Sequence, residues 1–384
     1  MRNNWSNVIS KDMKYINFIE PTYIVKTATA AFAKFIKGEA YSNGLLHVKE
    51  FERSLSRYLK VKYCVCVNSG TAGLILAIKA LGLDKEVIVP SFTFSGSVHA
   101  LAWNGIVPKF VDIDKVSLNL DMDKVRQNIT SKVTAILAVH MFGNPCDIYE
   151  LEKIAKDHRL RLIFDSAHAF GSQYEGKMIG GFGDLEVFSF QTTKVLSTIE
   201  GGVVTTNSKD LYEKMLILRS QGNRGDGNCL YVGLNARIHP MAALLGRLNL
   251  KTMDKDIRAR QKLGEFYFYQ LSKVPGIGLQ GINKKSDHNY QYIPIIIDKN
   301  AFGMSRDRLV EKLEKNNISI RKYFYPPVHK FNCYRHIKTG SSLKNTEFVS
   351  DNVICLPFYG SMRPDTIKYI CKNILRIHQG CGRL

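Results

Sequence analysis

Short apolar runs alternate with amphipathic stretches along the first part of the chain. Runs rich in Val, Ile, Leu and Phe, which favour buried strands, occupy residues 63–67, 86–90, 109–112, 135–139, 162–164, 185–190 and 203–206. Apolar residues at helical spacing predict helices between several of these runs, at 73–81, 95–104, 147–158 and 209–220. This alternation is typical of an α/β fold built around a mostly parallel, buried sheet.

The pattern changes towards the two ends of the chain. Residues 1–30 are mixed in character and predict no element. Apolar positions at helical spacing predict helix between residues 31 and 60, interrupted by a turn at Tyr41-Ser42-Asn43-Gly44. A glycine-rich loop at 221–228 precedes a long helical stretch from Pro240 to about Ser272, which we interpret as the bridge to a second domain.

The length of the chain also indicates two domains. A chain of 384 residues is too long for one ordinary hydrophobic core. We therefore expect a large α/β domain at 1–250 and a smaller C-terminal domain at 251–384. The smaller domain contains a predicted strand at 292–297 and predicted helices at 305–316 and 364–377.

Charge and composition narrow the class of protein. The net charge is +20, but the basic residues are spread along the chain, which favours a lysine-rich solvated surface over nucleic-acid binding. A positive field of this kind can also attract an anionic substrate. No apolar run approaches the roughly 20 residues that span a bilayer, and the N-terminus lacks the apolar segment of a signal peptide. Eight scattered cysteines without a C-x-x-C pair favour reduced thiols in the cytoplasm over disulfides or a metal site.

Two charged residues follow predicted strands, and together they indicate a chemistry. Asp165 ends the run 162–164, and Lys194 follows the run 185–190. In a parallel sheet, side chains at the carboxyl ends of strands can converge on one ligand. Pyridoxal phosphate uses both residue types, because its aldehyde bonds a lysine amine and its ring nitrogen needs an acidic partner. Each residue alone is more simply a turn-capping Asp or a surface Lys.

Two further segments could contribute to such a site. Asn68-Ser69-Gly70-Thr71-Ala72 joins a predicted strand to a predicted helix, a layout in which backbone N–H groups can hold a phosphate. Gly70 lets the phosphate approach and Thr71 adds a hydroxyl, although Ser-Gly-Thr is also an ordinary helix cap. Phe94 comes just after the strand 86–90, where it could stack on a cofactor ring or belong to the core.

With these residues in place, the chain resembles the DegT/DnrJ/EryC1/StrS family of sugar aminotransferases over nearly its whole length. The motifs that carry the resemblance are SGTA at 69–72, P-S-x-T-F at 90–94, D-x-A-H-A-x-G at 165–171, F-S-F-x-x-T-K at 188–194, E-G-G at 200–202 and G-x-N-x-R at 233–237. The resemblance implies the type I aminotransferase fold. Its large domain has a mostly parallel seven-stranded sheet, and its smaller C-terminal domain is α+β.

The resemblance also implies roles for individual residues. Lys194 corresponds to the lysine that forms the Schiff base, and Asp165 to the partner of the pyridinium nitrogen. His168 corresponds to the residue beside the ring hydroxyl, and Phe94 to the ring that stacks on the cofactor. The residues that correspond to phosphate ligands are Gly70, Thr71, Ser189 and, from the neighbouring subunit of a homodimer, Asn235. Tyr325 and His329 lie in the segment that approaches the sugar nucleotide in the family.

The family implies a substrate class as well. L-glutamate would donate an amino group to the keto carbon of a nucleotide-linked keto-deoxyhexose. The segments 168–171 and 321–329 are most similar to members that aminate C4 of dTDP-4-dehydro-6-deoxy-D-glucose, on the way to an amino sugar such as viosamine for O-antigen or other surface polysaccharide. A C3 aminotransferase of a dTDP-3-keto-6-deoxyhexose is the alternative, and UDP- or GDP-linked ketosugars stay open.

Some positions depart from the family pattern, and they concern the shape of the substrate pocket. They are Leu45-Leu46, Gln191, Thr192 and Ser197-Thr198-Ile199.

Two other classes of protein also stay open. One is a basic nucleic-acid-binding protein that has lost the chemistry, which the intact pair of Lys194 and Asp165 disfavours. The other is an amino-acid aminotransferase, in which Arg237 or Arg321 would bind the substrate carboxylate.

Overall fold

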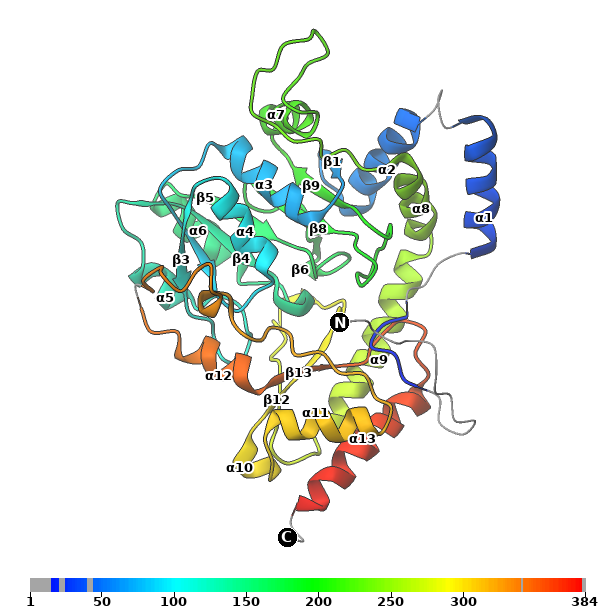
Figure 1. Cartoon of the computed structure of the whole chain (residues 1–384), viewed down its shortest axis with the longest axis vertical. Helices are drawn as coiled ribbons and strands as arrows, with labels where there is room; N and C mark the ends of the chain where they lie inside the picture. The colour runs from blue at the N-terminus through cyan, green and yellow to red at the C-terminus, as the bar shows by residue number, and fades with distance from the viewer. Residues whose placement is uncertain (1–14, 21–24, 40–43, 340, 382–384) are drawn as a thin grey trace.

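A seven-stranded sheet forms the centre of the first part of the chain (Figure 1). The computed structural model describes residues 15–20, 25–39, 44–339 and 341–381. In spatial order, the strands of the sheet are β1 (Tyr63–Val67), β9 (Gly202–Thr206), β8 (Leu185–Ser189), β5 (Arg161–Asp165), β4 (Val133–Val139), β2 (Glu86–Pro90) and β3 (Val107–Val111). β9 pairs antiparallel with both of its neighbours, and every other pairing in the sheet is parallel. The predicted mostly parallel α/β sheet is confirmed.

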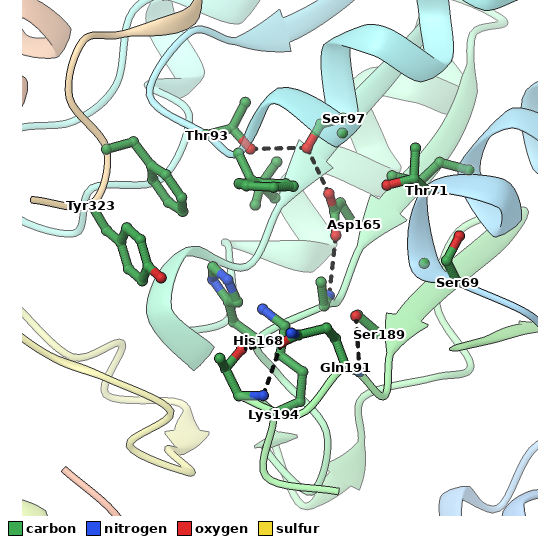
Figure 2. Close-up of a pocket in the computed structure, with 18 of the residues that line it drawn as sticks. Ser69, Thr71, Thr93, Ser97, Asp165, His168, Ser189, Gln191, Lys194 and Tyr323 are labelled. Atoms are coloured by element: carbon green, nitrogen blue, oxygen red, sulfur yellow. Dashed lines mark hydrogen bonds between the residues drawn. The ribbon is translucent and has the colours of Figure 1, made fainter. Parts of the chain in front are cut away.

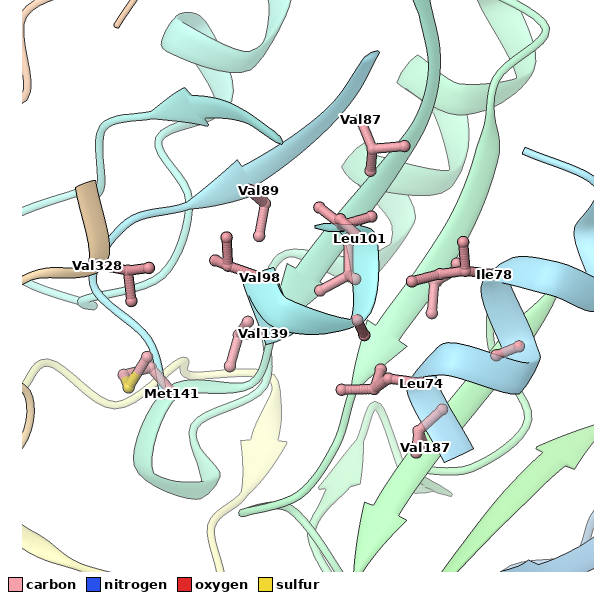
Figure 3. Close-up of a cluster of buried hydrophobic side chains, with 14 of the residues drawn as sticks. Leu74, Ile78, Val87, Val89, Val98, Leu101, Val139, Met141, Val187 and Val328 are labelled. Atoms are coloured by element: carbon pink, nitrogen blue, oxygen red, sulfur yellow. The ribbon is translucent and has the colours of Figure 1, made fainter. Parts of the chain in front are cut away.

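Helices cover both faces of this sheet. The helices whose apolar side chains pack on one face are α3 (Gly70–Leu81), α4 (Ser95–Trp103) and α7 (Lys209–Arg219). The helices that pack on the other face are α2 (Gly44–Leu59), α5 (Met122–Gln127), α6 (Ile148–Asp157), α8 (Pro240–Leu250) and the start of α9 (Met253–Leu271). Because strand side chains alternate, Val87 and Val89 of β2 face the first group of helices while Ile88 faces the second. Figure 3 shows the first of these cores, where Leu74 of α3 lies next to Val187 of β8.

A third apolar core lies beyond the sheet. It packs around a three-stranded antiparallel sheet of β10 (Ile277–Leu279), β12 (Ile293–Ile297) and β13 (Val353–Leu356). The helices in this part of the chain are α10 (Lys299–Phe302), α11 (Arg306–Lys315), α12 (Lys344–Asn352) and α13 (Pro364–Gln379), with a 3₁₀ turn at Val328–Lys330. The α9 helix begins in the second core with Met253 and ends in the third with Leu271. The division of the chain at residue 250 stays a prediction.

Smaller elements complete the described chain. They are α1 (Val25–Lys34), a π-helical turn at Phe35–Glu39, a 3₁₀ turn at Met141–Gly143, and a ribbon of β6 (Gln173–Tyr174), β7 (Lys177–Met178) and β11 (Ser286–Asp287). In the described ranges, every helix is too short or too polar to cross a membrane.

The structure refines one predicted element and adds others. The helical stretch predicted from 240 to about 272 is confirmed as two helices, α8 and α9, which Lys251 and Thr252 separate. At this break the hydroxyl and the N–H of Thr252 both bond the carbonyl oxygen of Asn249, at 3.1 Å. α1 begins before the helical region predicted at 31–60 and ends inside it, and α5, β10, β13 and α12 had no sequence prediction. Of the turn predicted at 41–44, residues 41–43 lie outside the described residues.

Candidate active site

A cavity of about 370 Å³ opens at the carboxyl ends of the central strands. Asp165 ends β5, Ser189 ends β8 and Val139 ends β4, and all three line the cavity. Strands that run parallel bring their carboxyl ends to one edge of the sheet, which explains this convergence. The predicted site residues that line the cavity are Gly70, Thr71, Phe94, Asp165, His168, Ser189 and Lys194.

Asp165 is held by short hydrogen bonds. The hydroxyl of Ser97 donates to its Oδ2 at 2.6 Å, and the N–H of Ala167 donates to its Oδ1 at 3.1 Å. Burial raises the pKa of Asp165, while these two bonds and the charge of Lys194 oppose the rise. A cation placed beside this carboxylate would therefore favour its ionised form.

Ser97 is in turn bonded to Thr93, and Figure 2 shows the chain of contacts from Thr93 through Ser97 to Asp165. The two hydroxyls lie 2.9 Å apart. Because the single proton of Ser97 goes to Asp165, Thr93 is the donor to Ser97. Both hydroxyls line the cavity, and the sequence analysis missed both. Their spacing of four residues at the start of α4 was the available signal.

Lys194 lies in the turn that follows β8. Its backbone N–H donates to the carbonyl of Gln191 at 2.8 Å, and its Nζ lies 5.7 Å from the centre of the Tyr292 ring. Burial lowers the pKa of Lys194 to about 8, although the charge of Asp165 opposes this shift. About a tenth of such amines are neutral at pH 7, and a neutral amine can act as nucleophile and base.

His168 is buried against aromatic rings. Its ring stacks on Phe142 and Phe324 at centroid distances of 6.1 Å, and it meets Tyr292 edge-on at 5.2 Å. Its Nδ1 accepts a hydrogen bond from the N–H of Phe142 at 3.3 Å. Burial lowers the pKa of His168, with a further contribution from Lys194, so the ring is neutral and its Nε2–H is the remaining donor.

The start of α3 forms a close backbone cradle. The hydroxyl of Ser69 caps the helix by accepting from the N–H of Ala72 at 3.1 Å, so the ordinary capping role is present. The first N–H groups of a helix lack partners within it and attract anions. A Cβ on Gly70 would lie 3.0 Å from Cβ of Ser189, so glycine at this position lets β8 and α3 approach closely.

Aromatic rings form another wall of the cavity. Phe94 is 58% exposed, although it is large and apolar, and its ring centre lies 6.3 Å from that of Phe324. Tyr292, Tyr323 and Phe324 come from the second part of the chain and complete this wall. The sequence analysis included Tyr323 and Phe324 in the segment 321–329 but gave them no role in the site.

Three predicted residues do not line the cavity. Asn235 is exposed on the segment before α8, and its carbonyl accepts from the side chain of Asn68 at 3.4 Å. Tyr325 is half-exposed, with the guanidinium of Arg306 over its ring. The Nδ1 of His329 lies 2.7 Å from the hydroxyl of Ser91, and its Nε2 lies 3.3 Å from Glu347. The roles of these three residues stay predictions.

Comparisons with known proteins show the family of the chain. The model of the DegT/DnrJ/EryC1/StrS aminotransferase family matches residues 22–375. The dTDP-4-amino-4,6-dideoxy-D-glucose transaminase of Shigella dysenteriae is 37% identical over 336 residues, which are 88% of this chain and 91% of that protein. The GDP-perosamine synthase of Vibrio cholerae is 34% identical over 87% of this chain and 91% of that protein.

Solved structures have the same fold. The structure of DesI in the presence of its TDP-sugar product has a TM-score of 0.90 and 32% sequence identity, covering 97% of this chain and 95% of DesI. Helicobacter pylori PseC, an aminotransferase involved in the biosynthesis of pseudaminic acid, has a TM-score of 0.87 and 26% identity, covering 96% of this chain and 100% of PseC.

The residues present fit the cofactor of these proteins, pyridoxal phosphate. The cavity combines a lysine of lowered pKa, a buried carboxylate, an exposed aromatic face and the start of a helix, whose N–H groups attract anions. A ring cation would favour the ionised form of Asp165, and the open face of Phe94 could cover a planar ring. The chain belongs to the DegT/DnrJ/EryC1/StrS aminotransferase family and is a pyridoxal-phosphate-dependent nucleotide-sugar aminotransferase.

Proposed function

We propose that the enzyme transfers an amino group from L-glutamate to C4 of dTDP-4-dehydro-6-deoxy-D-glucose. The observation that carries this choice of substrate is the similarity to two dTDP-4-amino-4,6-dideoxy-D-glucose transaminases, from Shigella dysenteriae and Escherichia coli, at 37% and 35% identity. A product of this kind, 4-amino-4,6-dideoxyglucose linked to dTDP, is suited to the assembly of surface polysaccharide such as O-antigen.

Residues of this chain have distinct tasks in the proposed reaction. When bound, pyridoxal phosphate supplies an aldehyde that accepts the amino group and a ring that withdraws electrons from the substrate carbon. The Nζ of Lys194 would hold the cofactor and then move a proton to and from the reacting carbon, which its pKa of about 8 permits near neutral pH. Asp165 would keep the ring nitrogen protonated, and the Nε2–H of His168 would face the ring hydroxyl.

The phosphate end of the cofactor requires backbone and hydroxyl groups. Gly70 and Thr71 at the start of α3, together with Ser189 at the end of β8, supply them on one side of the cavity. We assign Asn235 of a second copy of the chain to the other side, because in this chain Asn235 is exposed and outside the cavity.

The surface next to Asn235 supports a homodimer. Leu230, Tyr231, Val232 and Leu234 are exposed large hydrophobic residues on the segment that leads to it. The loop that follows α7 extends away from the sheet in Figure 1. Contiguous exposed apolar residues of this kind mark interaction surfaces. If the sites are shared, a mixture of inactive Lys194→Ala and inactive Asn235→Ala subunits regains activity, because hybrid dimers contain one intact site.

The similarity to sugar transaminases disfavours an amino acid in place of the ketosugar. Among the described residues that line the cavity, Lys194 is the single Lys or Arg residue, so the α-carboxylate of the donor glutamate also meets no arginine of this chain there. Arg237 and Arg321, the two candidates from the sequence, are exposed and outside the lining. The sugar nucleotide would instead contact the aromatic wall and, in the family's manner, Tyr325 and His329.

We place the enzyme in the cytoplasm. Its eight cysteines are free, and several are fully buried, as expected where thiols stay reduced. Sugar nucleotides and glutamate are available in the same compartment.

A panel of keto-sugar nucleotides tests the substrate. Purified enzyme loaded with pyridoxal phosphate and L-glutamate is incubated with 4-keto and 3-keto dTDP-sugars and with GDP- and UDP-linked 4-keto sugars. The proposal predicts the highest kcat/KM for dTDP-4-dehydro-6-deoxy-D-glucose, with the product amine at C4 by NMR. A higher kcat/KM for a GDP-linked sugar, or amination at C3, would overturn the proposed substrate. The assignment of the chain as an aminotransferase would still stand.

A further inference from the structure

The turn that carries Lys194 is held from the second part of the chain by one side chain. Gln291 lies just before β12 and is 1% exposed. Its Nε2 donates to the carbonyl oxygen of Thr193 at 2.8 Å, and its Oε1 accepts from the N–H of Val195 at 3.0 Å. These two backbone groups belong to the residues directly before and after Lys194. A single amide therefore fixes the backbone on both sides of the lysine.

Gln291 is itself fixed on the opposite side. Its backbone N–H donates to Oδ1 of Asn289 at 2.9 Å. The Nδ2 of Asn289 donates to the carbonyl oxygens of His168 at 2.8 Å and Phe170 at 3.0 Å. The short segment 289–291 thus joins the turn of Lys194 to the turn of His168. Both turns line the cavity, although 26 positions separate the two residues in the sequence.

The residue after Gln291 extends the same arrangement. The hydroxyl of Tyr292 lies 3.4 Å from the hydroxyl of Thr193, and its ring contacts both His168 and Lys194. Other bonds come from within the turn, where Oε1 of Gln191 accepts from the N–H and the hydroxyl of Thr193 at 2.9 and 2.8 Å. Without Gln291, the part-buried carbonyl of Thr193 and N–H of Val195 lose their partners in Gln291, and leaving such groups unpaired is costly.

We propose that Gln291 is a positioning residue for Lys194, which sets the place of Nζ in the cavity by holding the two peptide groups that flank the lysine. The proposal rests on the role proposed above for Lys194. A misplacement of about 1 Å can cost roughly a hundredfold in rate, so a brace on this turn matters for the proton transfers assigned to Nζ.

A purely structural role for Gln291 makes a different prediction, and the chain offers a matched control. Gln280 is 3% exposed, and its Nε2 donates to the carbonyl oxygens of Ser117 and Met141 at 2.8 and 3.1 Å. It is a buried glutamine that bonds two backbone groups, like Gln291, but neither group flanks Lys194. Gln280→Leu therefore reports the cost of losing such bonds at a position away from the lysine.

The test compares Gln291→Leu, Gln291→Asn and Gln280→Leu. Asparagine keeps the amide but is one methylene too short to reach both peptide groups. In the protein without cofactor, the pH dependence of Lys194 acylation by trace acetic anhydride, followed by mass spectrometry, reports the reactivity of Nζ directly. In the loaded enzyme, steady-state kinetics separate kcat from KM.

We expect the Gln291 variants to move the acylation midpoint of Lys194 upward, because a loosened turn lets water reach Nζ. We also expect kcat to fall about tenfold or more with KM for the sugar nearly unchanged. Gln280→Leu should lose a comparable amount of stability but leave the acylation midpoint of Lys194 and kcat unchanged. If Gln291→Asn folds and matches Gln280→Leu in midpoint and kcat, the proposal is wrong. A fully active Lys194→Ala enzyme would instead overturn the role of the lysine itself.

Discussion

The hydroxyl of Ser97 donates a 2.6 Å hydrogen bond to Oδ2 of Asp165, joining the first turn of α4 to the end of β5. The bond favours the ionised carboxylate, since it opposes the rise in pKa that burial causes. In the role proposed for Asp165, the ionised carboxylate would keep the cofactor's ring nitrogen protonated, so Ser97 would support the reaction without touching the substrate carbon.

Replacement of Ser97 by alanine should therefore raise the pKa of Asp165 further. Hydrogen bonds to charged groups contribute about 1.5–3 kcal/mol, so we expect the acid limb of the kcat profile to move up by about one to two pH units. The profile between pH 5 and 9 checks this. Thr93→Val removes only the donor to Ser97 and should move the limb less, in the same direction. An acid limb that stays in place in Ser97→Ala would remove Ser97 from this role.

A buried carboxylate beneath the site makes stability depend on pH. Glu186 of β8 accepts hydrogen bonds from the N–H groups of Gly180 and Phe182 and from the hydroxyl of Ser166, at 2.7–2.9 Å. Burial nevertheless raises the pKa of Glu186 to about 7, from an ordinary value of 4.5. Between these two values the folded protein binds more protons than the unfolded chain, so this group makes stability fall as pH rises from 4.5 through 7.

Glu186→Gln should remove that loss, because an amide can occupy the same place without ionising. A shift of this size corresponds to about 3 kcal/mol at most. Urea unfolding at pH 5 and pH 8 measures the change in the free energy of unfolding between these pH values. The contribution of Glu186 is this change in the wild type minus the same change in the variant. The subtraction is needed because His140 and His168 also titrate, with lowered pKa values. Parallel pH dependences in the two proteins would contradict this account of Glu186.

The glycine at the start of β9, Gly202, lies close against the start of α3, where the cofactor phosphate is proposed to bind. A Cβ on Gly202 would lie 2.6 Å from the carbonyl oxygen of Phe188 and 2.9 Å from the nitrogen of Gly70, and neither backbone atom can yield. Gly202→Ala should therefore displace the start of α3, destabilise the protein by about 1–3 kcal/mol and weaken cofactor binding about tenfold.

Gly278→Ala is a suitable control for that change. A Cβ on Gly278 would lie 3.6 Å from the nearest atoms, those of Ile296, which is an ordinary contact. Urea unfolding and a fluorescence titration with pyridoxal phosphate check the two variants. Equal affinities for the cofactor in Gly202→Ala and the wild type would show that the start of α3 does not depend on this close approach.

Much of the site could be predicted from the sequence, because its residues follow strands that apolar runs in the sequence predict. Asp165 and Lys194 come at the ends of apolar runs, and the parallel order of β5 and β8 brings such ends together. The start of α3 was placed three residues late, since Gly70 lowers helix propensity although Ser69 caps the helix there.

The remainder depends on contacts between distant segments. Gln291 bonds residues that precede it by 96 and 98 positions, and no local pattern marks such a partner. Tyr323 and Phe324 line the cavity just after Arg321, which bridges to Cys355 of β13, 34 positions later in the sequence. The break after α8 arises from side-chain bonds of Thr252, which compete with helix propensity.

The central claim is that Lys194 binds pyridoxal phosphate and that glutamate supplies the amino group. The most direct test is the near-ultraviolet and visible absorbance of wild type and Lys194→Ala, each loaded with the cofactor, before and after L-glutamate. The account predicts a band at the edge of the visible region in the wild type that disappears with glutamate, and no such band in the variant. A band that persists in Lys194→Ala, or one that glutamate leaves unchanged in the wild type, would contradict it.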